Sequence, residues 1–287
     1  MINGWLIYSG RDAIENKAYI EWFIEEGKKQ SLHIALILRE HLSIGIYQNM
    51  HSVLYHGVHV DLPRFAIVRT VEPMMNRILE ELGVSVFNSS TLSEICNDKA
   101  RTYFEVAKLG IPMVDTVFIK RENILETPPM SYPFVIKEVA GRGGKNVFLI
   151  KNFEEWVAYT QQLTASDYVI QSTEVQLGKD LRVFVVGSEI VGAVMRMSQS
   201  DFRANYKLGG SATWYPLNSD EKKLIFKITS QFDFGMVGID FLIGHQGELL
   251  FNEIEDVVGS RTLSAVSDVN ILEKYVTFIK ERVAKDI

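Results

Sequence analysis

The chain has 287 residues, of which 47% are hydrophobic and 23% charged, and its formal net charge is −6. This composition is typical of a globular protein with a sizeable core, and the acidic balance argues against nucleic acid or an anionic membrane as a partner. No apolar stretch approaches the roughly 20 residues that cross a bilayer. Cys96 is the single cysteine, so no internal disulfide forms, and without a recognisable signal peptide we expect a cytoplasmic protein.

The first third of the chain alternates short apolar runs with helical periodicity. Strands are predicted over 4–10, 32–38 and 64–69, and amphipathic helices over 13–29 and 72–83. This alternation predicts a small parallel sheet covered by helices, and therefore an α/β N-terminal domain over 1–95.

From residue 96 onward, antiparallel hairpins alternate with helices. A strand, a glycine loop and a second strand are predicted over 132–151, and a hairpin over 180–197 turns at Gly187 and Ser188. A second hairpin follows over 238–255, and an amphipathic helix over 269–285 closes the pattern. This part of the chain is therefore predicted to form an α+β unit.

A glycine-rich loop, "GRGGKN" at 141–146, lies between two predicted strands. Its glycines leave room for backbone amides to close on phosphate oxygens, and Arg142 and Lys145 add positive charge. The loop is not a Walker motif, because no Gly-Lys-Ser/Thr ends it. Lys137 lies between apolar neighbours in the preceding strand, where a charged side chain is unfavourable unless it meets an anion. The alternatives are an exposed basic hairpin and a lysine on a solvated face.

A polar segment, "SQSDFRANYKLGGSA" at 198–212, presents Arg203, Asn205 and Lys207 ahead of two glycines. Arginine meets phosphate through two parallel hydrogen bonds, and paired glycines permit a close backbone approach. A surface loop without a ligand is the alternative.

The predicted hairpin over 238–255 carries three carboxylates among apolar residues. A turn centred on His245 and Gln246 would place Asp240 opposite Phe251 and diagonal to Glu253, and Glu255 shares a face with Glu253. Carboxylates within roughly 5 to 8 Å of one another are unfavourable unless they are protonated or bridged by a cation. Oxygen ligands favour Mg²⁺ or Mn²⁺. Alternatively, Glu255 begins a solvated loop.

In this order, the motifs resemble the ATP-grasp superfamily, in particular its RimK-like branch of carboxylate–amine ligases. The resemblance covers nearly the whole chain and rests on the segments 65–112, 132–150, 177–196, 201–205 ("DFRAN") and 238–255. It implies a two-lobed α+β ATP-grasp fold after the N-terminal domain, with a central lobe over 96–175 and a C-terminal lobe over 176–287.

The resemblance also implies a role for individual residues. The positions that match the family's ATP-binding residues are Lys99, Lys137, Gly141, Arg142, Gly143, Gly144, Gln171, Ser172, Thr173, Asp180, Arg203 and Asn205. Within this set, Arg203 and Lys137 would act on the transferred phosphate, and residues 171–173 would hold adenine at the hinge between the lobes. The positions that match metal ligands are Asp240 and Glu253. Glu255 stands where the family commonly has Asn, and two Mg²⁺ or Mn²⁺ ions are implied.

The reaction implied is ATP-dependent amide formation through an acyl phosphate, with release of ADP and phosphate. The substrates would be a small carboxylate, such as an amino acid or peptide, and an amine. Arg69 and Arg261 are candidate clamps for a substrate carboxylate. A homo-oligomer is compatible with this branch, whereas nucleic acid and membrane partners are not expected. An ATP-grasp kinase and a nucleotide-binding scaffold without turnover remain the alternatives.

Overall fold

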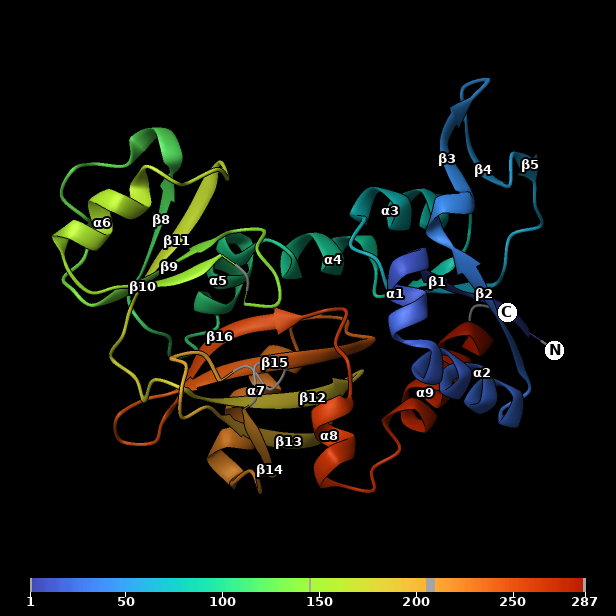
Figure 1. Ribbon diagram of the computed structural model, residues 1–287. Coiled ribbons are helices and arrows are strands. Elements are labelled where there is room, and N and C mark those ends of the chain that lie inside the picture. Colours follow the sequence, from blue (N-terminus) through green and yellow to red (C-terminus); the bar gives the residue numbers. More distant parts are fainter. Residues whose placement is uncertain (1, 145, 205–209, 286–287) are drawn as a thin grey trace.

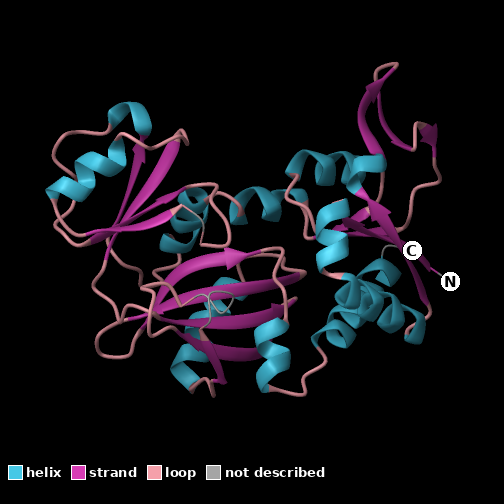
Figure 2. Ribbon diagram, in the orientation of Figure 1, coloured by secondary structure: helices cyan, strands magenta, loops and turns pink. Residues whose placement is uncertain are grey.

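The computed structural model describes residues 2–144, 146–204 and 210–285. Its strands form four sheets, shown in magenta in Figure 2 with the helices between and around them. Within these ranges, no helix is both long and apolar enough to cross a membrane.

The N-terminal part contains the predicted parallel sheet. Its strands, in the order β2-β1-β6-β7, are β1 (Ile2–Tyr8), β2 (Leu32–Leu38), β6 (Phe65–Val68) and β7 (Ser85–Phe87), all paired in parallel. The helices are α1 (Gly10–Glu15), α2 (Lys17–Lys29) and α3 (Pro73–Glu81). The prediction of a single helix over 13–29 is wrong in one respect. The helix is interrupted at Asn16, which separates α1 from α2.

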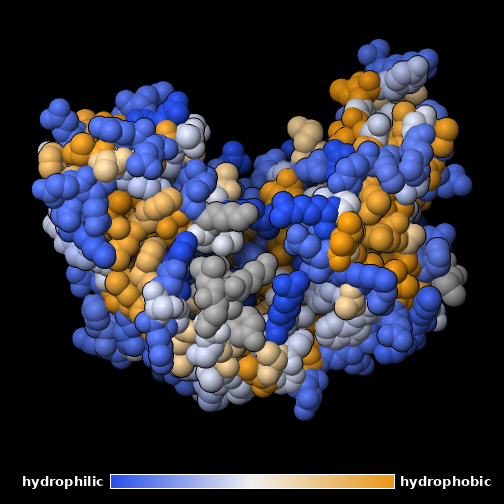
Figure 3. All heavy atoms as spheres, viewed as in Figure 1, coloured by the Kyte–Doolittle hydropathy of each residue, from blue (hydrophilic) through white to orange (hydrophobic). Residues whose placement is uncertain are grey.

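A three-stranded antiparallel sheet projects from this domain (Figure 1). It consists of β3 (Leu42–Tyr47), β4 (Met50–Tyr55) and β5 (Val58–His59). Ile46, Tyr47 and Met50 at its tip are exposed, and Figure 3 shows orange, apolar side chains along the projection.

The helices α4 (Ser90–Cys96) and α5 (Lys99–Ala107) connect the N-terminal sheet to the central sheet. That sheet is antiparallel, in the order β10-β9-β11-β8, with β8 (Thr116–Lys120), β9 (Phe134–Glu138), β10 (Val147–Ile150) and β11 (Asp167–Ser172). Helix α6 (Phe153–Thr160) covers it with Trp156, which is almost fully buried. The glycine loop joins β9 to β10, as predicted.

The fourth sheet is antiparallel and has five strands, in the order β14-β13-β12-β15-β16. These are β12 (Lys179–Val186), β13 (Glu189–Met197), β14 (Ser211–Trp214), β15 (Met236–Ile243) and β16 (Leu249–Glu255). The remaining helices are α7 (Ser219–Thr229), α8 (Arg261–Val266) and α9 (Ile271–Lys285). The limits predicted for the three domains remain predictions.

Helix α9 packs against the N-terminal domain, although the five-stranded sheet precedes it in the chain (Figure 1). Tyr275 lies edge-on to Phe23 of α2, with 6.1 Å between the ring centroids. Ile279 and Val283 are fully buried in the same cluster as Leu6 of β1. Helices α2 and α9 therefore share one core with β1.

The predicted register of the acidic hairpin is wrong. The turn at His245 and Gln246 forms, but the pairing shifts between Asp240 and Phe241, so Asp240 lies opposite Glu253 and Phe241 opposite Phe251. This β-bulge leaves Asn252 without a direct partner residue across the strand pair. The bulge brings the carboxylates closer together than the predicted register does.

Candidate active site

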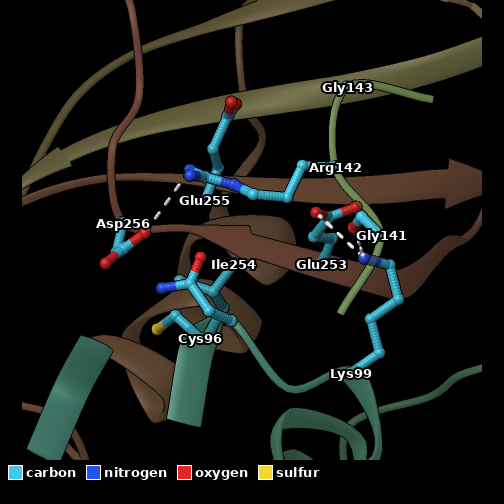
Figure 4. Close-up of a pocket in the computed structure, with 10 residues that line it drawn as sticks. Cys96, Lys99, Gly141, Arg142, Gly143, Glu253, Ile254, Glu255 and Asp256 are labelled. Atoms are coloured by element: carbon cyan, nitrogen blue, oxygen red, sulfur yellow. Dashed lines mark hydrogen bonds and ion pairs between the residues drawn. The ribbon is translucent and has the colours of Figure 1, made fainter. Parts of the chain in front are cut away.

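A pocket lies where the start of α5, the glycine loop and the end of β16 meet. Figure 4 shows its lining, which includes Lys99, Gly141, Arg142, Glu253, Glu255 and Asp256. These residues come from segments far apart in the sequence, and the fold brings together predicted nucleotide-binding and metal-binding residues.

Lys99 opens helix α5, and Asp98 caps the helix by accepting from the backbone N–H of Arg101. The Lys99 ammonium donates to the Gly141 carbonyl and lies 3.7 Å from the Glu253 carboxylate. Lys99 is itself buried. A basic group therefore lies between the glycine loop and β16, where a phosphate would approach both.

Lys137 points into the interior and not toward bulk solvent. Its ammonium donates to the Tyr103 hydroxyl at 2.8 Å and to the Asn252 side-chain oxygen at 3.1 Å. Tyr103 donates in turn to the Asn252 carbonyl. Burial lowers the pKa of Lys137 to about 7, and Glu253 opposes this shift. The bulge that displaces Asn252 thus supplies a neutral partner for the buried lysine.

Arg203 connects the C-terminal lobe to the glycine loop. Its Nη1 donates to the Gly144 carbonyl at 2.6 Å, while Asp201 accepts from Nε and Nη2 at 3.0 and 2.7 Å. The carboxylate of Asp201 therefore orients the guanidinium toward the glycine loop. Asn205, the second predicted residue of this motif, lies outside the described residues.

Two of the three carboxylates that are predicted to hold a metal, Asp240 and Glu255, are paired with arginine side chains. Both oxygens of Asp240 accept from Arg182, at 2.7 and 2.6 Å, and Arg196 adds a bond of 2.8 Å. Glu255 pairs with Arg182 at 2.5 Å. Across the described ranges, no three His, Cys, Asp or Glu side chains are grouped so that they could hold a metal ion. Guanidinium groups supply the positive charge that adjacent carboxylates need.

Two carboxylates on this face have pKa values that reflect these partners. Although burial raises the pKa of Asp240, Arg182 and Arg196 lower it to about 2. Burial raises the pKa of Asp180 to about 6, against the opposing effect of Arg196, which donates to it at 2.6 and 2.7 Å. Both oxygens of Asp180 accept from Arg196, and its predicted place near the ribose stays a prediction.

The three carboxylates predicted to hold Mg²⁺ differ in their exposure. Glu253 and Glu255 line the pocket, and each keeps about 30% of its side chain exposed. Carboxylate oxygens with room for water and phosphate suit Mg²⁺. Asp240 is buried, and its oxygens accept hydrogen bonds from Arg182 and Arg196, so its role as a metal ligand stays a prediction.

The predicted hinge residues are consecutive: Gln171 and Ser172 end β11, and Thr173 directly follows it. Gln171 is buried at the end of β11, where it donates to Thr116 and accepts from Tyr103. The Ser172 backbone donates to the Asp115 carbonyl, and the Thr173 hydroxyl donates to the Pro133 carbonyl at 2.8 Å. Gln171 is therefore the hinge residue that shares a partner with Lys137.

The two candidate substrate arginines are placed differently. Arg69 directly follows β6, and its Nη2 donates to the Val258 carbonyl at 2.8 Å. Arg261 opens α8 and reaches the Asn16 side chain at 3.3 Å in an exposed contact. Arg69 thus joins the N-terminal sheet to the loop after β16, while Arg261 is a surface residue.

Sequence reasoning missed Arg182, Tyr103 and Asn252 as site residues. Arg182 lies between apolar neighbours in "DLRVFVV", which is the signal that singled out Lys137. Tyr103 lies on the apolar face of an amphipathic helix, where an aromatic residue is expected for packing alone. The role of Asn252 depends on the bulge in β16. Neither carries a local signal.

Comparisons with known proteins identify the family of this chain. A family model described as the RimK-like ATP-grasp domain matches residues 96–279. The chain belongs to the RimK-like ATP-grasp family. This match confirms the predicted fold class and the resemblance to RimK-like ATP-grasp ligases.

Relatives of this RimK-like chain are named as ligases. It is 27% identical over 217 residues to glutamate–LysW ligase ArgX of Sulfurisphaera tokodaii, covering 72% of this chain and 77% of that protein. It is 28% identical over 277 residues to α-aminoadipate–LysW ligase LysX of Saccharolobus solfataricus, covering 90% and 97%. The expectation of an ATP-dependent carboxylate–amine ligase is thereby confirmed.

Solved structures of low sequence identity share the fold. A RimK domain ATP-grasp protein from Sphaerobacter thermophilus aligns with a TM-score of 0.75 at 16% identity, covering 96% of this chain and 98% of that one. D-alanine–D-alanine ligase from Bacillus anthracis aligns with a TM-score of 0.74 at 14% identity, covering 99% and 98%.

Proposed function

We propose that this RimK-like protein phosphorylates a substrate carboxylate with ATP and couples the acyl phosphate to an amine, releasing ADP and phosphate. The observation that carries the proposal is the convergence of Lys99, Lys137 and Arg203 on the glycine loop and β16. These cations come from three separate segments, and a triphosphate is the ligand that would use all of them. Catalysis of phosphoryl transfer depends mainly on such positioning and charge stabilisation.

Each basic residue has a distinct part in this proposal. Lys99 and Lys137 neutralise the nucleotide phosphates, exchanging the Gly141 carbonyl and Tyr103 for phosphate oxygens. Arg203 stabilises the negative charge that develops on the transferred phosphoryl group, because Asp201 already orients the Arg203 guanidinium. The glycine loop, drawn toward Arg203 through Gly144, excludes water that would hydrolyse the acyl phosphate.

Asp240, Glu253 and Glu255 would hold Mg²⁺, and two ions are proposed. The metal would supply charge neutralisation for the phosphates. Without the metal, Asp240 keeps Arg182 and Arg196 in place. Gln171 to Thr173 would line the adenine side, and Asp180 would orient Arg196.

The substrates are proposed to be small carboxylates and amines. The relatives named above ligate glutamate or α-aminoadipate to LysW. Human N-acetylaspartylglutamate synthase A is 30% identical over 232 residues, and the aligned region spans 78% of this chain and 59% of the human protein. Amino acids are therefore the first substrates to test, with Arg69 and Arg261 as candidate carboxylate clamps.

Product analysis tests the proposal. The protein is incubated with ATP, Mg²⁺ and pairs of amino acids, and the nucleotides and amide products are identified by mass spectrometry. ADP and phosphate are expected to form only when a carboxylate and an amine are both present. AMP with pyrophosphate would contradict an acyl phosphate, and a stable phosphorylated substrate would indicate a kinase.

A further inference from the structure

A second cavity lies where the N-terminal sheet, the five-stranded sheet and α9 meet. Its walls come from β7 and the segment after it, from residues 233–235 ahead of β15, and from the last turns of α9. Its volume is about 400 Å³, within the roughly 300 to 1,000 Å³ of small-molecule sites, which often lie at junctions between domains. Among the described residues, its lining shares none with the pocket of Figure 4. The cavity is therefore separate from the proposed active site.

Three phenylalanines line this cavity. Phe87, at the end of β7, lies edge-on to Phe278 of α9, with 6.1 Å between the ring centroids. Phe234 is almost fully buried in the wall, whereas Phe278 is only partly buried. Aromatic rings are stabilised by edge-to-face and offset contacts with other rings. The wall therefore favours a ligand that places an aromatic ring beside Phe278.

The charged part of the lining has an excess of positive charge. Phe278, Arg282 and Lys285 are spaced by four and three residues on α9, so they share one face of the helix. Asp233 is the one carboxylate in the described lining, and it pairs with Arg282. Both side chains of this pair are exposed to solvent, and an exposed ion pair contributes little stability. An anionic group on a ligand can therefore displace Asp233 from Arg282, while Asp233 disfavours a second negative charge.

Asn88 connects this cavity to the proposed phosphate pocket. Asn88 lines the cavity and is buried, and its Oδ1 accepts from the Gly235 N–H at 2.8 Å. Its Nδ2 donates to the Asp256 carbonyl at 2.8 Å. Asp256 lines the pocket of Figure 4 and lies 3.9 Å from Arg142 of the glycine loop. Because Asn88 holds both segments, a ligand that alters its position also alters the position of Asp256.

We infer that this cavity binds a small aromatic compound with a single negative charge, and that the bound compound changes nucleotide affinity through Asn88. The ring packs against Phe87 and Phe278, and the anionic group pairs with Arg282 and Lys285. The inference goes beyond the proposed ligation, because this compound is neither the nucleotide nor a substrate. Coupling between two binding sites is reciprocal, so Mg²⁺ and ADP should change the affinity for the compound by the same factor.

The first test identifies the class of ligand. Phenylacetate, 3-phenylpropionate and indole-3-acetate are titrated into the full chain by calorimetry at pH 8. Three analogues each change one feature: cyclohexylacetate lacks the aromatic ring, phenylacetamide lacks the charge, and phenyl phosphate carries a second negative charge. We expect at least one aromatic monoanion to bind, and the analogues to bind at least roughly threefold more weakly. Failure of all three monoanions to bind, or equal binding of the analogues, would overturn the inference.

Substitutions in the lining then locate the bound compound. Arg282→Gln should raise its Kd roughly tenfold, and Phe278→Leu roughly threefold. Asp233→Asn should lower the Kd roughly threefold, because Arg282 no longer has a competing carboxylate, and damage to the fold cannot tighten binding. Arg11→Gln, which also breaks an exposed ion pair on a helix, and Phe226→Leu, which removes an exposed ring from α7, are the matched controls. Effects as large in the controls as in the cavity variants would place the compound elsewhere.

Nucleotide affinity tests the connection through Asn88. The Kd of ADP with Mg²⁺ is measured with and without a saturating concentration of the compound that binds. We expect a change of roughly fivefold or more in the wild type. At the same concentration, Arg282→Gln should show little change because its cavity stays largely empty.

Asn88→Ser loses the bond to the Asp256 carbonyl, so it should bind the compound without the change in ADP affinity. Its urea midpoint shows whether it folds, and Arg282→Gln gives the comparison if it does not. An ADP Kd that stays the same when the compound is bound would contradict the coupling. None of these measurements requires turnover, so their outcome is independent of the proposed ligation, which fails only if no pair of substrates releases ADP.

Discussion

Arg182 and Asp240 lie opposite each other on β12 and β15 and share two hydrogen bonds, of 2.7 and 2.6 Å. Arg182 also pairs with Glu255 on β16, so one guanidinium joins three strands of the sheet beneath the pocket. The pair is largely buried, and a buried ion pair is costly to break because the remaining charge is left without a partner.

Asp240→Asn is therefore expected to lower the free energy of unfolding by about 3 kcal/mol or more. The substitution keeps the size of the side chain and removes the charge that faces Arg182 and Arg196. Urea unfolding followed by circular dichroism measures the change. Asp220→Asn, in the exposed pair with Lys223, is the matched control and should leave the midpoint unchanged. Equal midpoints for the two variants would contradict a stabilising role for the buried pair.

Lys137 makes stability depend on pH in a defined direction. Its pKa is about 7 in the folded protein and 10.5 when unperturbed, so the unfolded chain binds more protons between these values. The cost of burying the charge is fully present below pH 7 and is relieved as pH rises toward 10.5, by up to about 1.4 kcal/mol per pH unit.

Lys137→Met should accordingly be more stable than the wild type at pH 7 without nucleotide, and the difference should narrow by pH 9.5. Urea unfolding at the two pH values measures it. The variant should also lose ATP turnover. A difference that stays constant over this range would mean that Lys137 titrates normally in the folded protein.

Arg203→Ala is expected to reduce turnover roughly 10²- to 10³-fold, the loss typical of removing one group that stabilises developing charge. ADP affinity should change little, because the lysines remain. Steady-state ADP release and ADP titration measure the two effects. Arg121→Ala, whose guanidinium contacts the Thr164 carbonyl at an exposed site, is the control. Wild-type turnover in Arg203→Ala would remove this residue from the mechanism.

Glu255→Asn restores the residue common in the family and is expected to stay active. The Mg²⁺ concentration at half-maximal rate should rise roughly tenfold, since the site loses one negative charge and Arg182 loses a partner. Glu255→Leu, which offers no oxygen, should lose most activity at any Mg²⁺ concentration. The test is the rate of ADP release measured across a Mg²⁺ titration. An identical Mg²⁺ dependence in the wild type, Glu255→Asn and Glu255→Leu would mean that Glu255 does not bind the metal.

Much of the architecture, and the meeting of the basic residues with the glycine loop, is predictable because the signals are local. The parallel N-terminal sheet follows from alternating strands and helices. Lys137 is predictable as a site residue because a charged side chain among apolar strand residues needs a partner. Arg182 also lies among apolar strand residues and is predictable in the same way. Arg203 and the glycine loop follow from motif order, and the structure places the two in contact through Gly144.

The features that were not predictable depend on contacts between distant segments. The bulge at Asn252 changes the hairpin register, and no residue of the turn signals it. The pairing of Asp240 with Arg196 requires knowing that β15 and β13 flank β12.

The packing of α9 on α2 has a consequence for synthesis of the protein. Phe23 and Leu6 share a core with Tyr275, Ile279 and Val283, so apolar surface of the N-terminal domain stays uncovered until α9 has left the ribosome. Domains usually fold as units in the order of translation. Here we expect β1 and α2 to complete their core only after α9 has been synthesised. Nascent chains that lack α9 should bind chaperones that recognise exposed apolar surface.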